Sequence, residues 1–218
     1  MSAETHTGPT PQQLGIGMRV SVHPHCDEYV DVILGALADV AEDGLTEGLA
    51  VATDAVGTFV GAPTEFPEQR LAAYLVALVA AAHRRSGNGH VVAHVLLSRG
   101  CPGEVTCDLP VTGLRPTAYV DLAPIGIGAK AAWSLYPLSP IPDATAIDVI
   151  YAAIDRARTR GTVASSVHFA TRLDGDLADV VATAVDAWSA VGAELSHVVT
   201  HLTIAVGSPT AEPSKETR

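Results

Sequence analysis

The chain contains one sequence pattern twice, and this repetition constrains its fold more than any other feature. Residues 90–95 (HVVAHV) return as residues 197–202 (HVVTHL), and each run leads to a Gly-x-Pro at the same distance. Two further matches precede them in the same order: VSVHP at 20–24 with WSLYP at 133–137 and, more weakly, VATD at 51–54 with FATR at 169–172. Because the order is the same in both halves, the sequence predicts a tandem duplication.

The spacing of apolar residues is also the same in the two halves. A strand-like alternation at 20–24 and 133–137 is followed by a helical spacing at 30–40 and 147–157. Further strands are expected over 45–53 and 55–61, and over 162–171 with a shorter continuation, and second helices over 71–82 and 177–191. The HVV runs complete each half as its last strand. This order predicts an α+β protein made of two ferredoxin-like βαββαβ units, with antiparallel sheets that each carry two helices on one face.

The unit boundaries follow from the repeats and from the residues between them. The first unit is expected over 14–103 and the second over 130–209. Residues 104–129 fit neither half and contain three prolines and three glycines, so they are interpreted as a linker. Residues 1–13 and 210–218 are polar and are expected to be flexible tails.

Composition excludes several classes of function. Among 218 residues, 13 Lys and Arg oppose 24 Asp and Glu, giving a formal net charge of −11. This charge argues against a nucleic acid or an anionic membrane as the main partner. No apolar run reaches the length of a spanning helix, the N-terminus has no apolar signal core, and three cysteines are too few for a disulfide framework. A soluble, cytoplasmic protein is therefore expected.

The alternation of the first strands assigns their side chains to two faces. If Val20, Val22, Trp133 and Leu135 point toward the helices, then Ser21, His23, Ser134 and Tyr136 point away. The polar face would also carry His90, His94, His197 and His201 from the HVV runs. A face that mixes hydroxyl, imidazole and small apolar groups is expected to be an interface, a pocket lining, or both.

Metal and hydrolase chemistry find little support in these residues. His90 and His94 would lie about 13 Å apart on a strand, too far to share one ion, and Cys101 and Cys107 lack zinc spacing. Ser134, His168 and Asp174 could in principle serve as nucleophile, base and orienter, but no nucleophile-elbow or phosphate-loop motif accompanies them. Asp176 is instead expected to cap the helix that follows it.

Several motifs together resemble the YkoF family, a group that binds thiamine or its hydroxymethylpyrimidine (HMP) moiety. They are SLYP at 134–137, VHFATRLDGD at 167–176, RGCPG at 99–103 and the two HVV runs. The resemblance covers about residues 17–209 and is closer in the second unit. In the first unit His23 stands where the second has Tyr136, and nothing matches His168.

The resemblance implies a non-enzymatic, cytoplasmic homodimer with one thiamine or HMP site per unit, no cofactor and no metal. It also implies a functional link to a membrane transporter that takes up these compounds. Polar contacts to the aminopyrimidine would come from Ser21 and Thr53 in the first unit and from Ser134 and Thr171 in the second. His23, Tyr136 and His168 would lie beside them. On a regular strand His168 and Thr171 face opposite sides, so a bulge would have to separate them.

The chemistry of the ligand agrees with these residues. A 4-aminopyrimidine offers an amine donor beside ring-nitrogen acceptors, which hydroxyls and a backbone edge can satisfy. The acidic excess, with Asp54, Asp174 or Asp176 near a site, would favour the cationic thiazolium. The differences between the units predict two sites of unequal affinity. A regulatory or interaction module that binds an amino acid or a protein remains the alternative, with a hydrolase as the third hypothesis.

Overall fold

The computed structural model describes residues 15–100, 119–139 and 143–210. The first half contains β1 (Gly17–Pro24), α1 (Tyr29–Glu42), β2 (Ala50–Thr53), β3 (Thr58–Gly61), α2 (Pro67–Arg85) and β4 (Val91–Arg99). The second half contains β5 (Gly128–Pro137), α3 (Asp143–Thr159), β6 (Val163–Val167), β7 (Ala170–Asp176), α4 (Leu177–Glu194) and β8 (Val198–Val206). This α+β element order is consistent with duplicated ferredoxin-like units.

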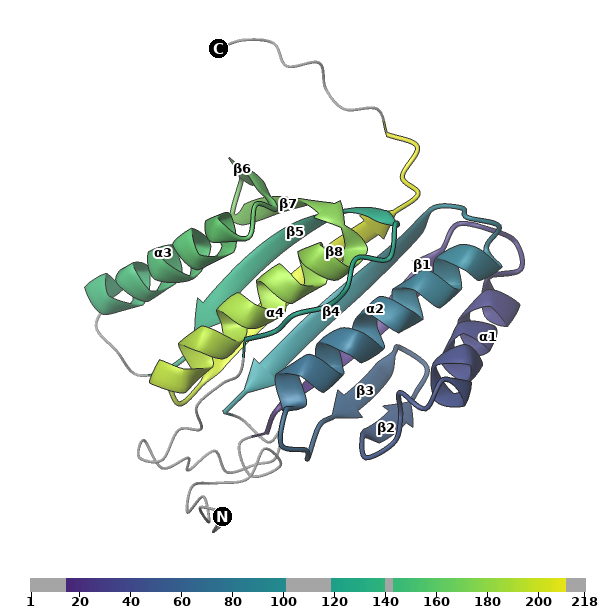
Figure 1. The fold of residues 1–218 in the computed structure, drawn as a ribbon, viewed down its shortest axis with the longest axis horizontal. Coiled ribbons are helices and arrows are strands. Elements are labelled where there is room, and N and C mark those ends of the chain that lie inside the picture. The colour runs from purple at the N-terminus through teal and green to yellow at the C-terminus, as the bar shows by residue number, and fades with distance from the viewer. Residues whose placement is uncertain (1–14, 101–118, 140–142, 211–218) are drawn as a thin grey trace.

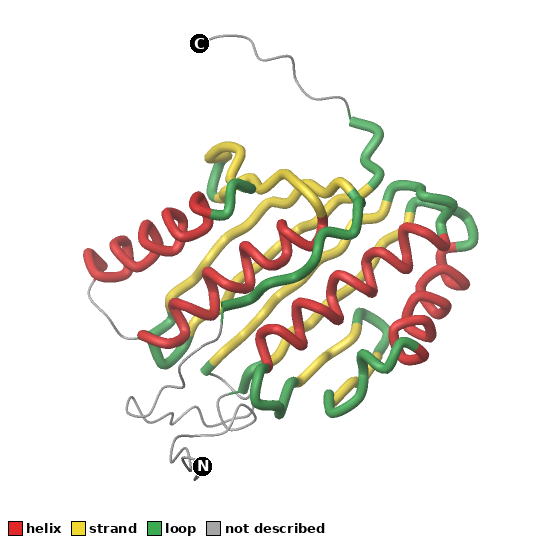
Figure 2. The backbone as a smooth tube through the Cα atoms, in the orientation of Figure 1, coloured by secondary structure: helices red, strands yellow, loops and turns green. Residues whose placement is uncertain are grey.

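The two halves share one sheet, whereas the sequence predicted a separate sheet for each. The strand order is β2-β3-β1-β4-β8-β5-β7-β6, and every neighbouring pair is antiparallel. The junction is the pairing of β4 with β8, which runs from Val91 opposite Val206 to Arg99 opposite Val198. All four helices lie on one face of the sheet (Figures 1 and 2). The long central strands therefore cover each other's edges, which would otherwise be open to pairing with another chain.

Burial confirms the predicted faces of the first strand of each half. Val20 and Val22 of β1 are buried, as are Trp133 and Leu135 of β5. Their neighbours Ser21, His23, Ser134 and Tyr136 are half-buried or exposed on the face without helices, called here the open face. The core thus lies between the sheet and the helices, as period-2 alternation requires.

The two outer helices bury only part of the stripe that their apolar spacing suggested. Val40 and Ala157 are buried and Ile33, Leu37 and Ile154 pack against the core, as expected. In α1 the buried residues are Val32, Ala36 and Val40, while Val30 and Leu34 are half or more exposed. At the corresponding positions of α3, Ile147 and Tyr151 are equally exposed. Among the described elements α1 packs against α2 and α3 against α4, each outer helix having one helical neighbour, so part of its apolar surface stays uncovered.

The segment predicted as one strand over 162–171 is a hairpin. Strands β6 and β7 pair from Val167 opposite Ala170, so His168 and Phe169 form a two-residue turn. Phe169 has a φ of 63°, the left-handed conformation that such tight hairpin turns need. A register irregularity does occur, but between Val163 and Ser165 rather than between His168 and Thr171.

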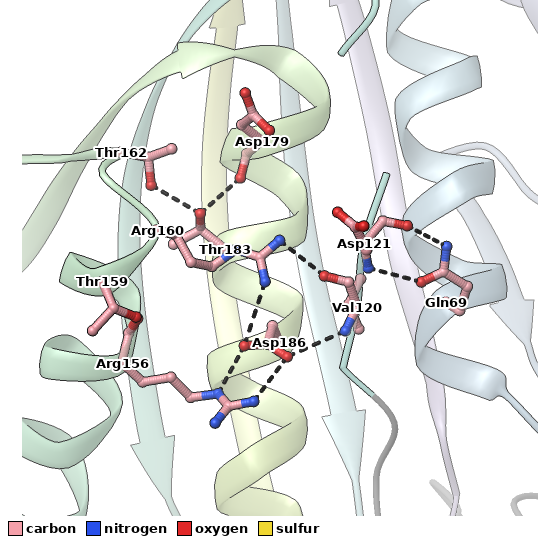
Figure 3. A network of polar contacts seen from close by, with 10 residues as sticks. All are labelled: Gln69, Val120, Asp121, Arg156, Thr159, Arg160, Thr162, Asp179, Thr183 and Asp186. Carbon is pink, nitrogen blue, oxygen red and sulfur yellow. Dashed lines mark hydrogen bonds and ion pairs between the residues drawn. The ribbon is translucent and has the colours of Figure 1, made fainter. Parts of the chain in front are cut away.

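Residues 119–127, within the predicted linker, run across the helices and are held by side chains from both halves. Asp186 of α4 is buried; its carboxylate accepts a hydrogen bond from the Val120 amide at 3.2 Å and from Arg156 Nε at 2.7 Å (Figure 3). Arg160 donates to the Val120 carbonyl at 2.9 Å and lies 3.6 Å from Asp186. Gln69 of α2 exchanges two hydrogen bonds with the backbone of Asp121. The segment is thereby fixed to α2 and α4.

Asp176 confirms the cap predicted for α4 and has a second role. Its carboxylate accepts a hydrogen bond from the Ala178 amide at 2.9 Å, as an N-cap does. It also accepts hydrogen bonds from the amides of Ile125 and Gly126. One carboxylate therefore starts the helix and anchors the end of the crossing segment.

None of the helices in the described residues has the length and apolar composition needed to cross a bilayer.

We expect Asp186→Asn to destabilise the fold by about 2–4 kcal/mol, because a partly buried arginine pair would lose its counter-charge. Chemical denaturation of wild type and variant measures the loss. Asp155→Asn is the matched control, since the Asp155–Arg158 pair is exposed on both sides and its loss should cost less than about 1 kcal/mol. Equal effects of the two changes would contradict the structural role of Asp186.

Candidate functional site

A cavity of about 300 Å³ opens in the first half between α1, the end of β1 and the turn from β2 to β3. Three residues predicted to bind ligand, Ser21, His23 and Thr53, line it. Its apolar wall includes Tyr29 and Ile33 of α1. Residues more than thirty positions apart in the sequence therefore meet at one concave site, with polar groups on one side and an aromatic and aliphatic wall on the other.

Ser21 and His23 follow each other on the open face of β1. Ser21 Oγ lies 3.0 Å from His23 Nε2, so the hydroxyl and the imidazole form a hydrogen bond. The His23 ring meets His94 of β4 edge-on, with 5.3 Å between ring centroids. Partial burial, together with the neighbouring His94 and His25, lowers the pKa of His23 below its usual value. His23 is thus favoured in its neutral form beside the cavity.

Thr53 reaches the cavity from the helix side of the sheet, whereas Ser21 and His23 lie on the open face. Thr53 pairs across the hairpin with Thr58, and Thr58 pairs with Val20, whose side chain points toward the helices. Thr53 Oγ1 and Thr58 Oγ1 lie 3.0 Å apart. The two groups of residues meet because the cavity lies at the exposed edge of β1 rather than on one face.

Asp54 holds the turn that closes the cavity. Its carboxylate accepts hydrogen bonds from the amides of Val56 at 2.8 Å and Gly57 at 3.1 Å, and it forms an ion pair with Arg19. The Arg19 hydrogen bond, followed by these amides, lowers the pKa of Asp54 to about 2. Asp54 lines the cavity, as the sequence suggested, but its charge is already paired with Arg19.

The second half brings its predicted site residues together less closely. Ser134 lies on the open face of β5 and its hydroxyl donates to the carbonyl of Phe169 at 3.1 Å. Tyr136 is exposed two residues farther on, and His168 is exposed in the β6–β7 turn. Thr171 is buried on the helix face, opposite Trp133. The turn, rather than a bulge, is what separates His168 from Thr171.

Strand register changes the correspondence between the two halves. Val20 lies opposite Thr58, and its counterpart Trp133 lies opposite Thr171. Thr171 therefore corresponds to Thr58, not to Thr53 as the weak sequence match suggested. Ser166, opposite Thr171 on β6, takes the place of Thr53. Sequence reasoning missed Thr58 and Ser166, although counting along each hairpin from its turn would have indicated both.

The open face carries a row of histidines across the centre of the sheet. The rings of His94 and His201 are nearly parallel with centroids 6.4 Å apart, and those of His25 and His90 stack at 4.3 Å. A second hollow of about 230 Å³, lined by His94 and His201, lies on this face and shares Ser21 with the cavity described above. The histidines therefore adjoin the candidate site.

The residues considered for other chemistry do not assemble. The hydroxyl of Ser134 donates a hydrogen bond to the carbonyl of Phe169, and Asp174 pairs with Arg172 at 3.4 Å. Among the described residues neither of them forms a hydrogen bond or ion pair with His168. In the described part of the chain, no three His, Cys, Asp or Glu side chains are grouped so that they could hold a metal ion. Cys101 and Cys107 lie outside the described residues.

Comparison with known proteins gives two matches. Residues 128–211 match the model of the YKOF-related family. The chain is also 28% identical to a protein of Bacillus subtilis (strain 168) named "Putative HMP/thiamine-binding protein YkoF". The match covers 92% of this chain and 94% of that protein. The family match contains the motifs at 134–137 and 167–176.

We expect stability to decrease as pH falls below about 6.5, the ordinary pKa of histidine. Burial first, and neighbouring histidines second, lower the pKa of His23 and of His90, so the unfolded chain binds more protons than the folded one just below 6.5. The stability that these two neutral histidines contribute is fully present above pH 6.5. It is lost as the pH falls toward their lower pKa values in the folded protein. Thermal melts between pH 5 and 8 measure this slope.

The combined variant His23→Gln, His90→Gln should reduce the pH slope of the melting temperature. His197, whose pKa is also lowered by burial, should account for part of the slope that remains. A slope that is unchanged in the double variant would show that these two imidazoles are not its origin.

Proposed function

Because these matches confirm the resemblance to the YkoF family, we propose that the protein binds thiamine or free HMP, one molecule in each half, without converting it. The relative's name supports the ligand class. The observation that carries the proposal is the cavity in the first half, where Ser21, His23 and Thr53 meet an apolar wall.

The cavity suits a small, flat heteroaromatic ring. Tyr29 and Ile33 offer the aromatic and aliphatic surfaces that such a ring stacks on. Ser21 and Thr53 offer hydroxyls that donate or accept as the ring requires. A volume of about 300 Å³ leaves room for a substituent beyond one six-membered ring. In the second half we propose Ser134, Tyr136, His168 and Thr171 as the site residues, with Ser166 in the position that Thr53 has in the first half.

A binding protein for these compounds would serve their uptake or salvage, in cooperation with a membrane transporter. We place this role in the cytoplasm. In this role the protein needs no catalytic group.

We expect Ser21→Ala with Thr53→Ala to weaken HMP binding to the first half by about tenfold or more, since each neutral hydrogen bond contributes about 0.5–1.5 kcal/mol. Isothermal titration calorimetry with HMP and with thiamine measures both sites. The double variant should lose or weaken one of two binding events, and Ser134→Ala should affect the other.

Ser98→Ala is the matched control for this titration, because Ser98 lies on β4 opposite Gly17 and does not line the cavity. Its binding curve should match the wild type. Wild-type protein that gives neither heat nor thermal shift with millimolar HMP or thiamine would refute the proposal. Heat with an amino acid instead would favour the regulatory alternative.

We further propose that a second copy of the chain covers the open face, giving a homodimer. Phe59 and Leu96 are each more than two-fifths exposed there, beside the central histidines. A broad sheet face with exposed apolar side chains is typical of an interface between subunits. The face is the same on both copies, so a twofold axis would bring like strands together.

We expect Leu96→Asp to shift a dimer to monomers, because a carboxylate would be buried at the centre of the face. Sedimentation equilibrium of wild type and variant tests this. Leu34→Asp is the matched control, since Leu34 is also an exposed leucine (60% against 44% for Leu96) but lies on α1, on the helix side of the sheet. A wild type that is monomeric at micromolar concentration would contradict the proposal.

A further inference from the structure

The second half of β1 has one edge without a partner strand, and this edge lines the cavity. Strand β1 pairs with β4 along its whole length, from Gly17 to Pro24. It pairs with β3 only from Gly17 to Val20, because the turn at residues 54–57 carries the chain away. Among the described residues, the edge from Ser21 to Pro24 therefore has no partner strand.

The register fixes which backbone groups point out of this edge. In an antiparallel pair the N–H and C=O of one residue point the same way, and successive residues alternate. The amide of His25 donates to the carbonyl of His90 at 2.9 Å, so His25, His23 and Ser21 direct these groups toward β4. The N–H and C=O of Val22 then point away from β4, toward the open edge.

A glycine gives independent support for this assignment of backbone directions. A Cβ placed on Gly57, in the turn beside β1, would approach the carbonyl oxygen of Val20 to 2.7 Å. The Val20 carbonyl therefore points toward the β3 side, and Val22, two residues along, points the same way. Val22 lines the cavity, where its N–H and C=O have no hydrogen-bond partner among the described contacts.

The second half repeats this arrangement. Strand β5 pairs with β8 from Ala129 to Pro137 but with β7 only as far as Trp133. The amide of Leu138 donates to the carbonyl of His197 at 3.0 Å, as His25 does to His90. By the same alternation, the N–H and C=O of Leu135 point to the unpaired edge.

We propose that these backbone pairs, on Val22 and Leu135, recognise the aminopyrimidine. This inference rests on the proposed function and adds the source of its specificity. The strand edge presents a donor and an acceptor side by side, and a 4-aminopyrimidine presents the complementary pair, an amine N–H beside a ring nitrogen. The Val22 carbonyl would accept from the amine and its N–H would donate to the ring nitrogen.

Backbone recognition is compatible with the differences between the halves. Val20 is replaced by Trp133 and His23 by Tyr136, yet the unpaired edge is the same in both. Side chains would then set how tightly each site binds, while the backbone sets which ring it accepts. The same pyrimidine without its exocyclic amine would leave the carbonyl unpaired and should bind about tenfold more weakly or worse at both sites.

Amide hydrogen exchange, followed by NMR on ¹⁵N-labelled protein, tests the inference directly. In the free protein the Val22 amide should exchange much faster than those of Ser21 and His23, which belong to the β1–β4 ladder. Saturating HMP should slow Val22 about tenfold or more, and Leu135 likewise. HMP that binds without slowing Val22, or that slows all of β1 equally, would overturn the inference and leave the proposed function standing.

A backbone variant supplies a second measurement. Val22→Pro removes an N–H that points out of the ladder, a place where a strand tolerates proline, and Val22→Ala is the control for the lost side chain. It should weaken binding to the first half about tenfold or more, whereas Val22→Ala, which keeps the N–H, should bind HMP far better than the proline variant. Equal binding by both variants would overturn the inference. If the proline variant does not fold, the exchange measurement still decides, and absence of binding by the wild type would refute the proposed function instead.

Discussion

The arrangement of this molecule depends on the pairing of β4 with β8. By joining the last strands of the two halves, it makes one sheet and places all four helices on the same side (Figure 1). As a result, the opposite face is left without helices across the whole sheet. The candidate interface on the open face is therefore a product of this junction, whereas the cavity in the first half is built from β1, α1 and the β2–β3 turn of that half alone.

The ligand cavity arises from a mismatch in strand length. β1 has eight residues and β3 has four, so half of β1 extends past its neighbour. The Asp54 turn ends the hairpin at this point, because its carboxylate is held by two amides and by Arg19. A tightly closed turn beside an extended strand leaves both a hollow and an unpaired backbone edge. Shape and hydrogen-bonding capacity thus have the same structural cause.

The sequence predicted the features that depend on local periodicity and left out those that depend on register. The alternation at 20–24 and 133–137 correctly assigned Ser21 and Ser134 to the open face, and the Asp-Leu pattern at 176–177 correctly started α4. The joined sheet was not predictable, because an HVV strand looks the same whether its outer edge is paired or open. The face of Thr53 and the turn at His168 were also missed, since both depend on where a hairpin reverses.

Register also explains why residue-by-residue matching between the halves fails at their hairpins. Thr53 and Thr171 align in sequence, but Thr171 lies opposite Trp133 as Thr58 lies opposite Val20. Matching Thr171 to Thr53 therefore places a hydroxyl on the wrong strand of the hairpin. The unpaired edges at Val22 and Leu135, in contrast, occupy the same place in both halves. When two copies of a unit diverge, side chains at a site can change one by one, but the hydrogen-bonding pattern of a strand edge persists as long as the neighbouring hairpin stays short. A backbone edge is therefore the part of such a site that duplication preserves best.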